Sequence, residues 1–230
     1  MGPLFRTLRF MRVVPPLPAL LRTAFVAVGL AGAVAIVVRP ESAHRAVIPV
    51  LVLQAFAAST GFSTYARRGH YDLLLTGGCG RVQAALVQWI VAVAPGVATW
   101  LALAAVETAT ARSGSLLASG TIAALFVVSA VAWASTVGLP RFSGAVGWLL
   151  LAVMGLSLAP APAADLTAWR DPAAVPAPGR ALLLFVCPIL LAGQGITALV
   201  VLPSLALATA GLIGALVWIH RTSVPLQAGQ

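Results

Sequence analysis

Long runs of apolar residues that contain no charged side chain divide this chain, and they constrain its fold more than any other feature. The runs cover residues 23–38, 46–64, 83–106, 116–138 and 143–160, and a last stretch covers 181–219. A bilayer core about 30 Å thick needs roughly 20 helical residues to cross it, and several runs meet that length. Only 8% of the residues are charged, against about 25% in soluble domains. We therefore predict an all-α integral membrane protein that forms one transmembrane domain over residues 1–230.

The segment before the first run carries arginines at regular spacing. Arg6, Arg9 and Arg12 fall on one face of a helix over residues 4–14, opposite apolar side chains. This pattern predicts a helix that lies in the membrane interface. A positively charged flank that only orients the first span is an equally good interpretation.

The arginines between the runs indicate the topology, because positive side chains collect on the cytoplasmic side of a membrane. With the amino terminus inside, the cytoplasmic arginines are Arg6, Arg9, Arg12, Arg22, Arg67, Arg68, Arg81, Arg141 and Arg221. The outer ones are then Arg39, Arg45, Arg112, Arg170 and Arg180. The same topology places Asp72 inside and the other four acidic residues, including Glu107, outside. We predict a multi-pass protein of the cell inner or plasma membrane with a cytoplasmic amino terminus.

The last apolar stretch, 181–219, is too long for one span, because a continuous helix would reach roughly 58 Å. Its breaking points are Pro188, the glycines around Gln194, and Pro203. The stretch therefore forms either two full spans or a re-entrant piece followed by one span.

The absence of some residue types and the wide spacing of others exclude several functions. All 14 basic residues are arginine, so a phosphate-binding loop with its lysine is missing and the chain is not itself an ATPase. His44, His70 and His220 lie at the ends of apolar runs, which disfavours an intramembrane protease or a metal site. We expect no catalytic residue, metal or cofactor. The positive charge contacts membrane lipid, and no nucleic acid is expected.

The interiors of the apolar runs contain no ionisable residue. Ion-driven carriers usually keep one near the middle of the membrane, where it couples the ion to the substrate. The polar residues present, such as Gln54, Gln88 and Gln194, suffice for helix packing. Energy for any uphill transport is therefore expected to come from a partner.

The loop at 65–82 joins the second and third runs on the predicted cytoplasmic side. Residues 65–81 read Y-A-R-R-G-H-Y-D-L-L-L-T-G-G-C-G-R, and its three leucines are too few to span a membrane. A short helix over 69–76, ended by Gly77 and Gly78, would present a compact knob to the groove of another protein. The alternative is a charged connector whose leucines are incidental.

This loop resembles the first cytoplasmic loop of the permeases of type-2 family ATP-binding-cassette (ABC) exporters. The resemblance rests on the order of seven residues: Arg67, Gly69, Asp72, Leu74, Leu75, Thr76 and Arg81. In that family the segment forms a coupling helix, and Gly78 stands where the family has a proline.

The resemblance implies six transmembrane helices, with 4–14 as the interfacial helix, 181–195 as a re-entrant outer segment, and both termini cytoplasmic. It implies an ATP-driven exporter, with ATP and Mg bound in separate ABC ATPase subunits. The uncharged interiors of the apolar runs favour an apolar or amphiphilic substrate. The other expected partner is a second permease copy or a sister permease. The residues implied to contact the ATPase are Arg67, Arg68, Gly69, His70, Tyr71, Asp72, Leu74, Leu75 and Thr76. A membrane scaffold or assembly factor that recruits a cytoplasmic partner without transport is the alternative.

Overall fold

The computed structural model describes residues 17–67, 75, 78, 80–111, 114–118, 120–138 and 198–221. Its elements are α2 (Ala19–Val38), the 3-10 helix η1 (Pro40–Ser42), α3 (Ala43–Arg67), α5 (Arg81–Ala111), α6 (Ser115–Ala118), α7 (Thr121–Gly138) and α10 (Ala198–Arg221). Every regular element in the described part of the chain is thus a helix, as predicted.

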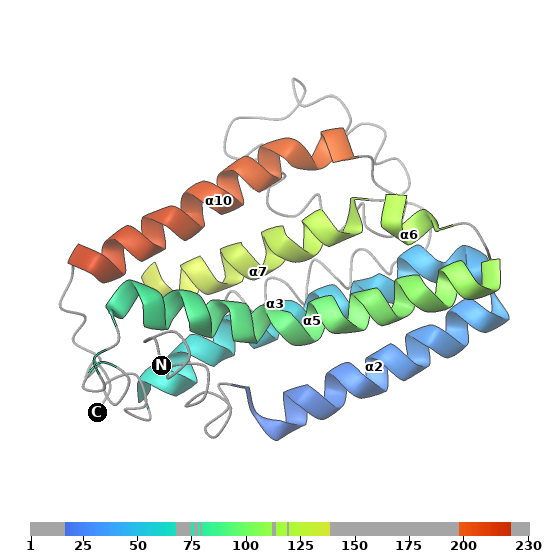
Figure 1. The fold of residues 1–230 in the computed structure, drawn as a ribbon, viewed down its shortest axis with the longest axis horizontal. Coiled ribbons are helices and arrows are strands. Elements are labelled where there is room, and N and C mark those ends of the chain that lie inside the picture. The colour runs from blue at the N-terminus through green and yellow to red at the C-terminus, as the bar shows by residue number, and fades with distance from the viewer. Residues whose placement is uncertain are drawn as a thin grey trace, which may run out of the picture.

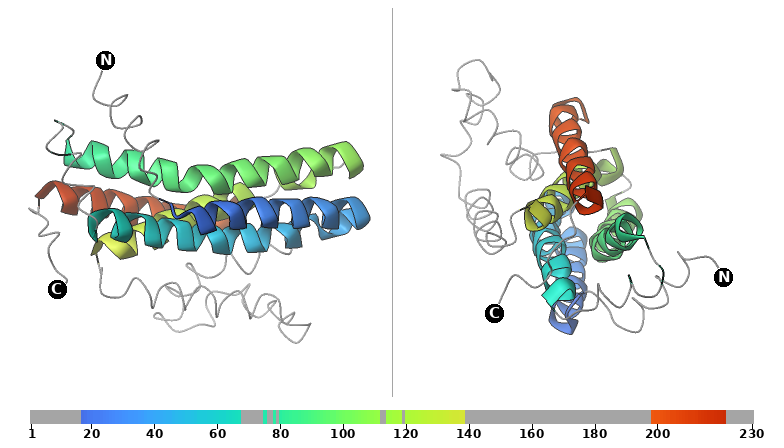
Figure 2. Two further views of the ribbon diagram at one scale, coloured as in Figure 1. Left: turned by 90° about the horizontal axis from the view of Figure 1, so that it is seen from below. Right: turned by 90° about the vertical axis from the view of Figure 1, so that its left-hand side faces the viewer.

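The long helices lie side by side in an elongated bundle (Figures 1 and 2). α3 contacts α2, α5 and α7, and α10 packs against α7. α3 ends, and α5 begins, at the end of the bundle where α10 also ends (Figure 1). The opposite end holds the connection from α2 to α3 and the α6 corner between α5 and α7.

Three helices are long and apolar enough to cross a membrane: Ala19–Val38, Ala43–Thr60 within α3, and Arg81–Thr110 within α5. Thr121–Val137 and Leu205–Arg221 are shorter apolar helices. The three long helices indicate a multi-pass membrane protein. The interfacial helix at 4–14, the run at 143–160 and the re-entrant segment at 181–195 lie outside the described residues.

Burial differs sharply between the helices. Of the apolar window of α3, 61% is buried inside the bundle, against 17% for α2. Small residues such as Ala55, Ala58 and Ala84 form part of the buried core, and they let helix backbones approach closely in the absence of water. Large side chains such as Leu20 and Leu30 on α2 are exposed, as expected for a lipid-facing helix.

Hydroxyl side chains satisfy backbone carbonyls within these helices. Thr60 donates to the Phe56 carbonyl at 2.6 Å, and Ser129 donates to the Leu125 carbonyl at 2.7 Å. Such bonds keep hydroxyl groups paired where no water is available. Thr99 donates to the carbonyl of Pro95 at 2.8 Å, next to the point where the proline interrupts the α5 hydrogen-bond ladder.

The structure corrects four points of the predicted helix layout. α2 begins before Arg22 and α5 continues past Glu107, so two charged residues expected in connecting segments lie within long helices. The run 116–138 is divided at Gly120 into α6 and α7. Pro203, proposed as a breaking point, lies inside α10. A proline in a helix removes one hydrogen bond, and in apolar surroundings neighbouring helices compensate for that loss.

The topology prediction can be tested with single cysteines at the two ends of the bundle. Gly80 and Glu41 are exposed and lie at opposite ends of α3 and α5. In a protein whose Cys79 and Cys187 are replaced by serine, a cysteine at Gly80 should react only with reagent on the cytoplasmic side. A cysteine at Glu41 should react only from outside. Labelling of both from the same side would contradict the predicted crossing.

Candidate functional site

The predicted coupling loop starts and ends on two central helices. Arg67 is the last residue of α3 and Arg81 is the first residue of α5. These two helices pack against each other along the bundle. A force applied to the loop would therefore reach both helices at once. Most of the predicted contact residues lie outside the described residues: Arg68, Gly69, His70, Tyr71, Asp72, Leu74 and Thr76.

Leu75 is the predicted contact residue whose side chain the structure describes. It is half-buried and packs against the hydrophobic core of the bundle. Gly78 follows with a φ of 80°, the left-handed conformation that glycine adopts most readily and that commonly ends helices. Its backbone N–H donates to the Leu75 carbonyl at 3.0 Å. Leu75 thus faces the protein's own core rather than standing free for a partner.

A buried amide connects α3 to α5 halfway along the bundle. Gln54 is fully buried, and its Nε2 donates to the carbonyl of Ala92 at 3.2 Å. The side chain fits because residue 96 is glycine: a Cβ placed on Gly96 would lie 2.9 Å from Gln54 Cδ and would overlap its Oε1. Gln54 therefore occupies a notch in α5 beside Pro95. The sequence marked Gln54 as a packing residue, but it held no signal for the notch.

Gln88 lies one helical turn from Ala92 on α5, and 1% of its surface is exposed. Neither its Oε1 nor its Nε2 has a hydrogen-bond partner within the described part of the chain. The indole of neighbouring Trp89 meets Phe126 of α7 edge to face, with ring centroids 5.7 Å apart. A buried amide with both groups unused has the capacity to bind water or a polar group inside the bundle.

The opposite end of the bundle is fixed by Glu107. Its carboxylate accepts the backbone N–H of Ser115 at 3.0 Å and that of Leu116 at 2.9 Å, and it accepts the Ser115 hydroxyl. The free N–H groups at the start of α6 are thereby satisfied. Nearby, Trp100 Nε1 donates to Thr121 Oγ1 at 2.9 Å. Sequence reasoning assigned Glu107 to a loop and missed this role.

No cluster of three or more His, Cys, Asp or Glu side chains that could hold a metal ion occurs within the described residues. The polar groups that the structure does bring together are amides, hydroxyls and one buried carboxylate used as a cap. Their hydrogen bonds join helices and cap the start of α6.

No protein-family model, curated protein or solved structure matches this chain. The resemblance of the 65–82 loop therefore stands on its residues alone, beside the helical architecture.

Proposed function

We propose that this protein is the membrane subunit of an ATP-driven ABC transporter, and that it exports an apolar or amphiphilic substrate. The observation that carries the proposal is the order of Arg67, Gly69, Asp72, Leu74, Leu75, Thr76 and Arg81 in the loop between α3 and α5. The full layout would have six spans, with both termini in the cytoplasm.

The position of the loop supports a coupling role. A segment that transmits force must connect to elements that extend through the membrane, and α3 and α5 both do so by length and composition. α3 is also the most buried of the three long helices. Movement of its cytoplasmic end would therefore be passed to α2, α5 and α7, which all contact it.

The helices attached to the loop contain points where they can bend. Pro49 lies inside α3 and Pro95 lies inside α5, and each proline removes one hydrogen bond of its helix. The bond from Gln54 to Ala92 joins α3 to α5 just before Pro95. A push on the loop would then tilt the half of α5 nearer the loop about Pro95. Gln54 would keep α3 and α5 together during this movement.

The partners follow from the chemistry that this chain lacks. It has no lysine for a phosphate loop, so ATP and Mg would bind to two separate ATPase subunits. A second permease copy or a sister permease would complete the pathway. In the described helices, no charged residue lies between Arg22 and the end of α2, or between Arg81 and Glu107 in α5. Uncharged helices favour apolar or amphiphilic cargo over highly charged solutes.

The test replaces Leu74 with aspartate. A charge placed in a dry protein contact costs several kcal/mol unless it is hydrated or paired, and each 1.4 kcal/mol is about a tenfold loss of affinity. We expect at least about a tenfold loss of the copurifying ATPase subunit and of substrate-stimulated ATP turnover. The measurement is affinity purification from membranes, followed by ATPase assays in lipid vesicles.

The conservative variant Leu74→Met and the outer-loop variant Asp165→Ala serve as controls for expression and folding. Both should keep the ATPase and its turnover. If Leu74→Asp also keeps them, or if no ATPase accompanies the wild-type protein, the coupling role is wrong. A partner that binds the loop without any ATPase would favour the scaffold alternative.

A further inference from the structure

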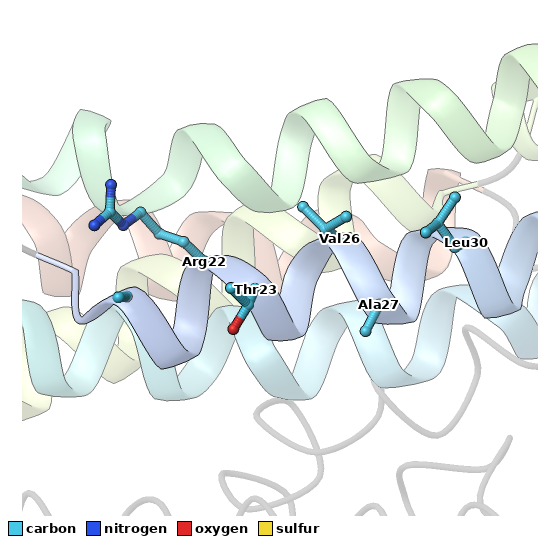
Figure 3. A pocket seen from close by; sticks show the side chains of 6 residues that line it. Arg22, Thr23, Val26, Ala27 and Leu30 are labelled. Atoms are coloured by element: carbon cyan, nitrogen blue, oxygen red, sulfur yellow. The ribbon is translucent and has the colours of Figure 1, made fainter.

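A shallow groove runs along α2, the least buried of the three long helices. It has a volume of about 480 Å³ and is open to its surroundings. The residues that line it are Ala19, Arg22, Thr23, Val26, Ala27 and Leu30. Figure 3 shows a guanidinium near one end and apolar side chains along the rest. The groove is therefore amphiphilic along its length.

The groove lies at a defined depth, because α2 and α5 run parallel in a fixed register. Gly29 packs against Thr99, and Gly32 packs against Leu103. The same register continued toward the start of both helices places Arg22 level with Ala92. Ala92 lies about three turns into α5.

This register places Arg22 at the edge of the hydrocarbon. α5 has 31 residues and a length of about 46 Å, roughly 16 Å more than the bilayer core. α2 and α5 end at nearly the same level (Figure 1). With the boundary of the hydrocarbon at this shared end, the excess extends beyond the membrane at the Arg81 end. About three turns of α5 account for that excess. Arg22 therefore lies where acyl chains meet lipid headgroups.

The Arg22 side chain has the geometry of a headgroup contact. It is exposed, and Figure 3 shows it directed back toward the end at which α2 begins, which is how arginines near a helix end reach the membrane surface. It has no ion pair within the part of the chain that the structure describes. The acidic residues in that part, Glu41 and Glu107, lie at the opposite end of the bundle.

The remaining groove residues fit an acyl chain. Val26 and Leu30 follow Arg22 at intervals of one turn, and both are exposed, at 62% and 65%. The Thr23 hydroxyl donates to the Leu20 carbonyl at 2.9 Å, so the side-chain donors of the groove that remain available to a ligand are those of Arg22. An arginine binds a phosphate oxygen pair through two parallel hydrogen bonds.

From this geometry we infer that the groove is a binding site for an anionic membrane phospholipid. The lipid phosphate binds Arg22, and one acyl chain lies along Val26, Ala27 and Leu30. Residues 1–16 are a less suitable occupant, because they carry three arginines and no acidic residue and would repel Arg22. The site does not depend on the transport function.

The inference is tested by thermal unfolding of the purified protein in neutral detergent with added lipid. Phosphatidylglycerol should raise the unfolding temperature more than phosphatidylcholine with the same acyl chains. In Arg22→Gln the apparent affinity for phosphatidylglycerol should fall about fivefold to tenfold, the expected effect of one arginine at an anionic headgroup. Arg22→Lys keeps the charge but loses the paired hydrogen bonds, and it should give an intermediate loss.

Arg221→Gln is the matched control, since Arg221 is an exposed arginine at the same end of the bundle on α10 and does not line the groove. Native mass spectrometry of retained phosphatidylglycerol gives a second reading if Arg22→Gln folds poorly. Equal losses in the two arginine variants would show diffuse charge attraction and overturn the site. Equal stabilisation by inorganic phosphate would show a free-anion site instead. A rise in phosphatidylglycerol affinity after deletion of residues 2–16 would show that this segment occupies the groove.

Discussion

Replacement of Gly96 by alanine is expected to lower the free energy of unfolding by about 3 kcal/mol, although it adds only a methyl group. Overfilling a packed interior costs about 1–3 kcal/mol, and the Gln54 side chain leaves the new methyl no room. Moving Gln54 would also break its bond to the Ala92 carbonyl, which contributes about 1 kcal/mol. Thermal or denaturant unfolding of the purified protein in detergent measures the loss.

Gly214 provides a matched control, because it is also a glycine in an apolar helix, yet an added Cβ would have no atom of the described residues within 4 Å. Gly214→Ala should leave stability unchanged or improve it, since alanine favours helix more than glycine. The double variant Gln54→Ala with Gly96→Ala should lose less than the sum of the two single variants, because the methyl then enters vacated space. Strict additivity would contradict the notch.

The long apolar runs predicted the helices well, because a bilayer imposes both their length and their composition. The run 46–64 corresponds to α3, and 83–106 corresponds to most of α5. The boundaries were less predictable. Arg22 and Glu107 were excluded from the runs because they are charged, although an arginine can reach the interface from within a helix and a carboxylate can be satisfied by backbone N–H groups.

The contacts between helices were not predictable from periodicity. Gln54 is a polar residue in an apolar run, which indicates an inward-facing position, but its partner on α5 is set by the packing of two helices. Gly96 could equally have been a flexible point or a site of helix contact. A sequence pattern of this kind gives the direction of a side chain, and the tertiary register decides what it meets.

The coupling loop is the converse case, because its sequence contains more information about function than the described part of its structure. The order of its residues predicts a partner, while the structure places its two ends on α3 and α5 and turns Leu75 toward the bundle. We therefore expect Leu74, rather than Leu75, to be the leucine whose replacement affects partner binding without destabilising the permease.

Removal of the Glu107 carboxylate is expected to destabilise the α5–α6–α7 corner. The side chain is 1% exposed and accepts two backbone N–H groups and one hydroxyl of the α6 start. Glu107→Leu would leave Ser115 N–H and Leu116 N–H without their acceptor, and each buried donor left unsatisfied costs about 1–3 kcal/mol. For these two donors, the expected loss in the free energy of unfolding is about 2–6 kcal/mol.

Glu107→Gln separates the cap from simple packing, because the amide has nearly the same shape as the carboxylate. One of its two polar atoms is a donor, so it would face a backbone or hydroxyl donor where the carboxylate accepts. Its stability should fall between that of wild type and that of Glu107→Leu. Glu41 is an exposed acidic residue at the same end of the bundle. Its replacement in Glu41→Gln should change the free energy of unfolding by less than about 0.5 kcal/mol. Urea or thermal unfolding of the four proteins gives the order, and hydrogen exchange at Ser115 and Leu116 locates the change. If Glu107→Leu unfolds like the wild type, the carboxylate does not hold this corner together.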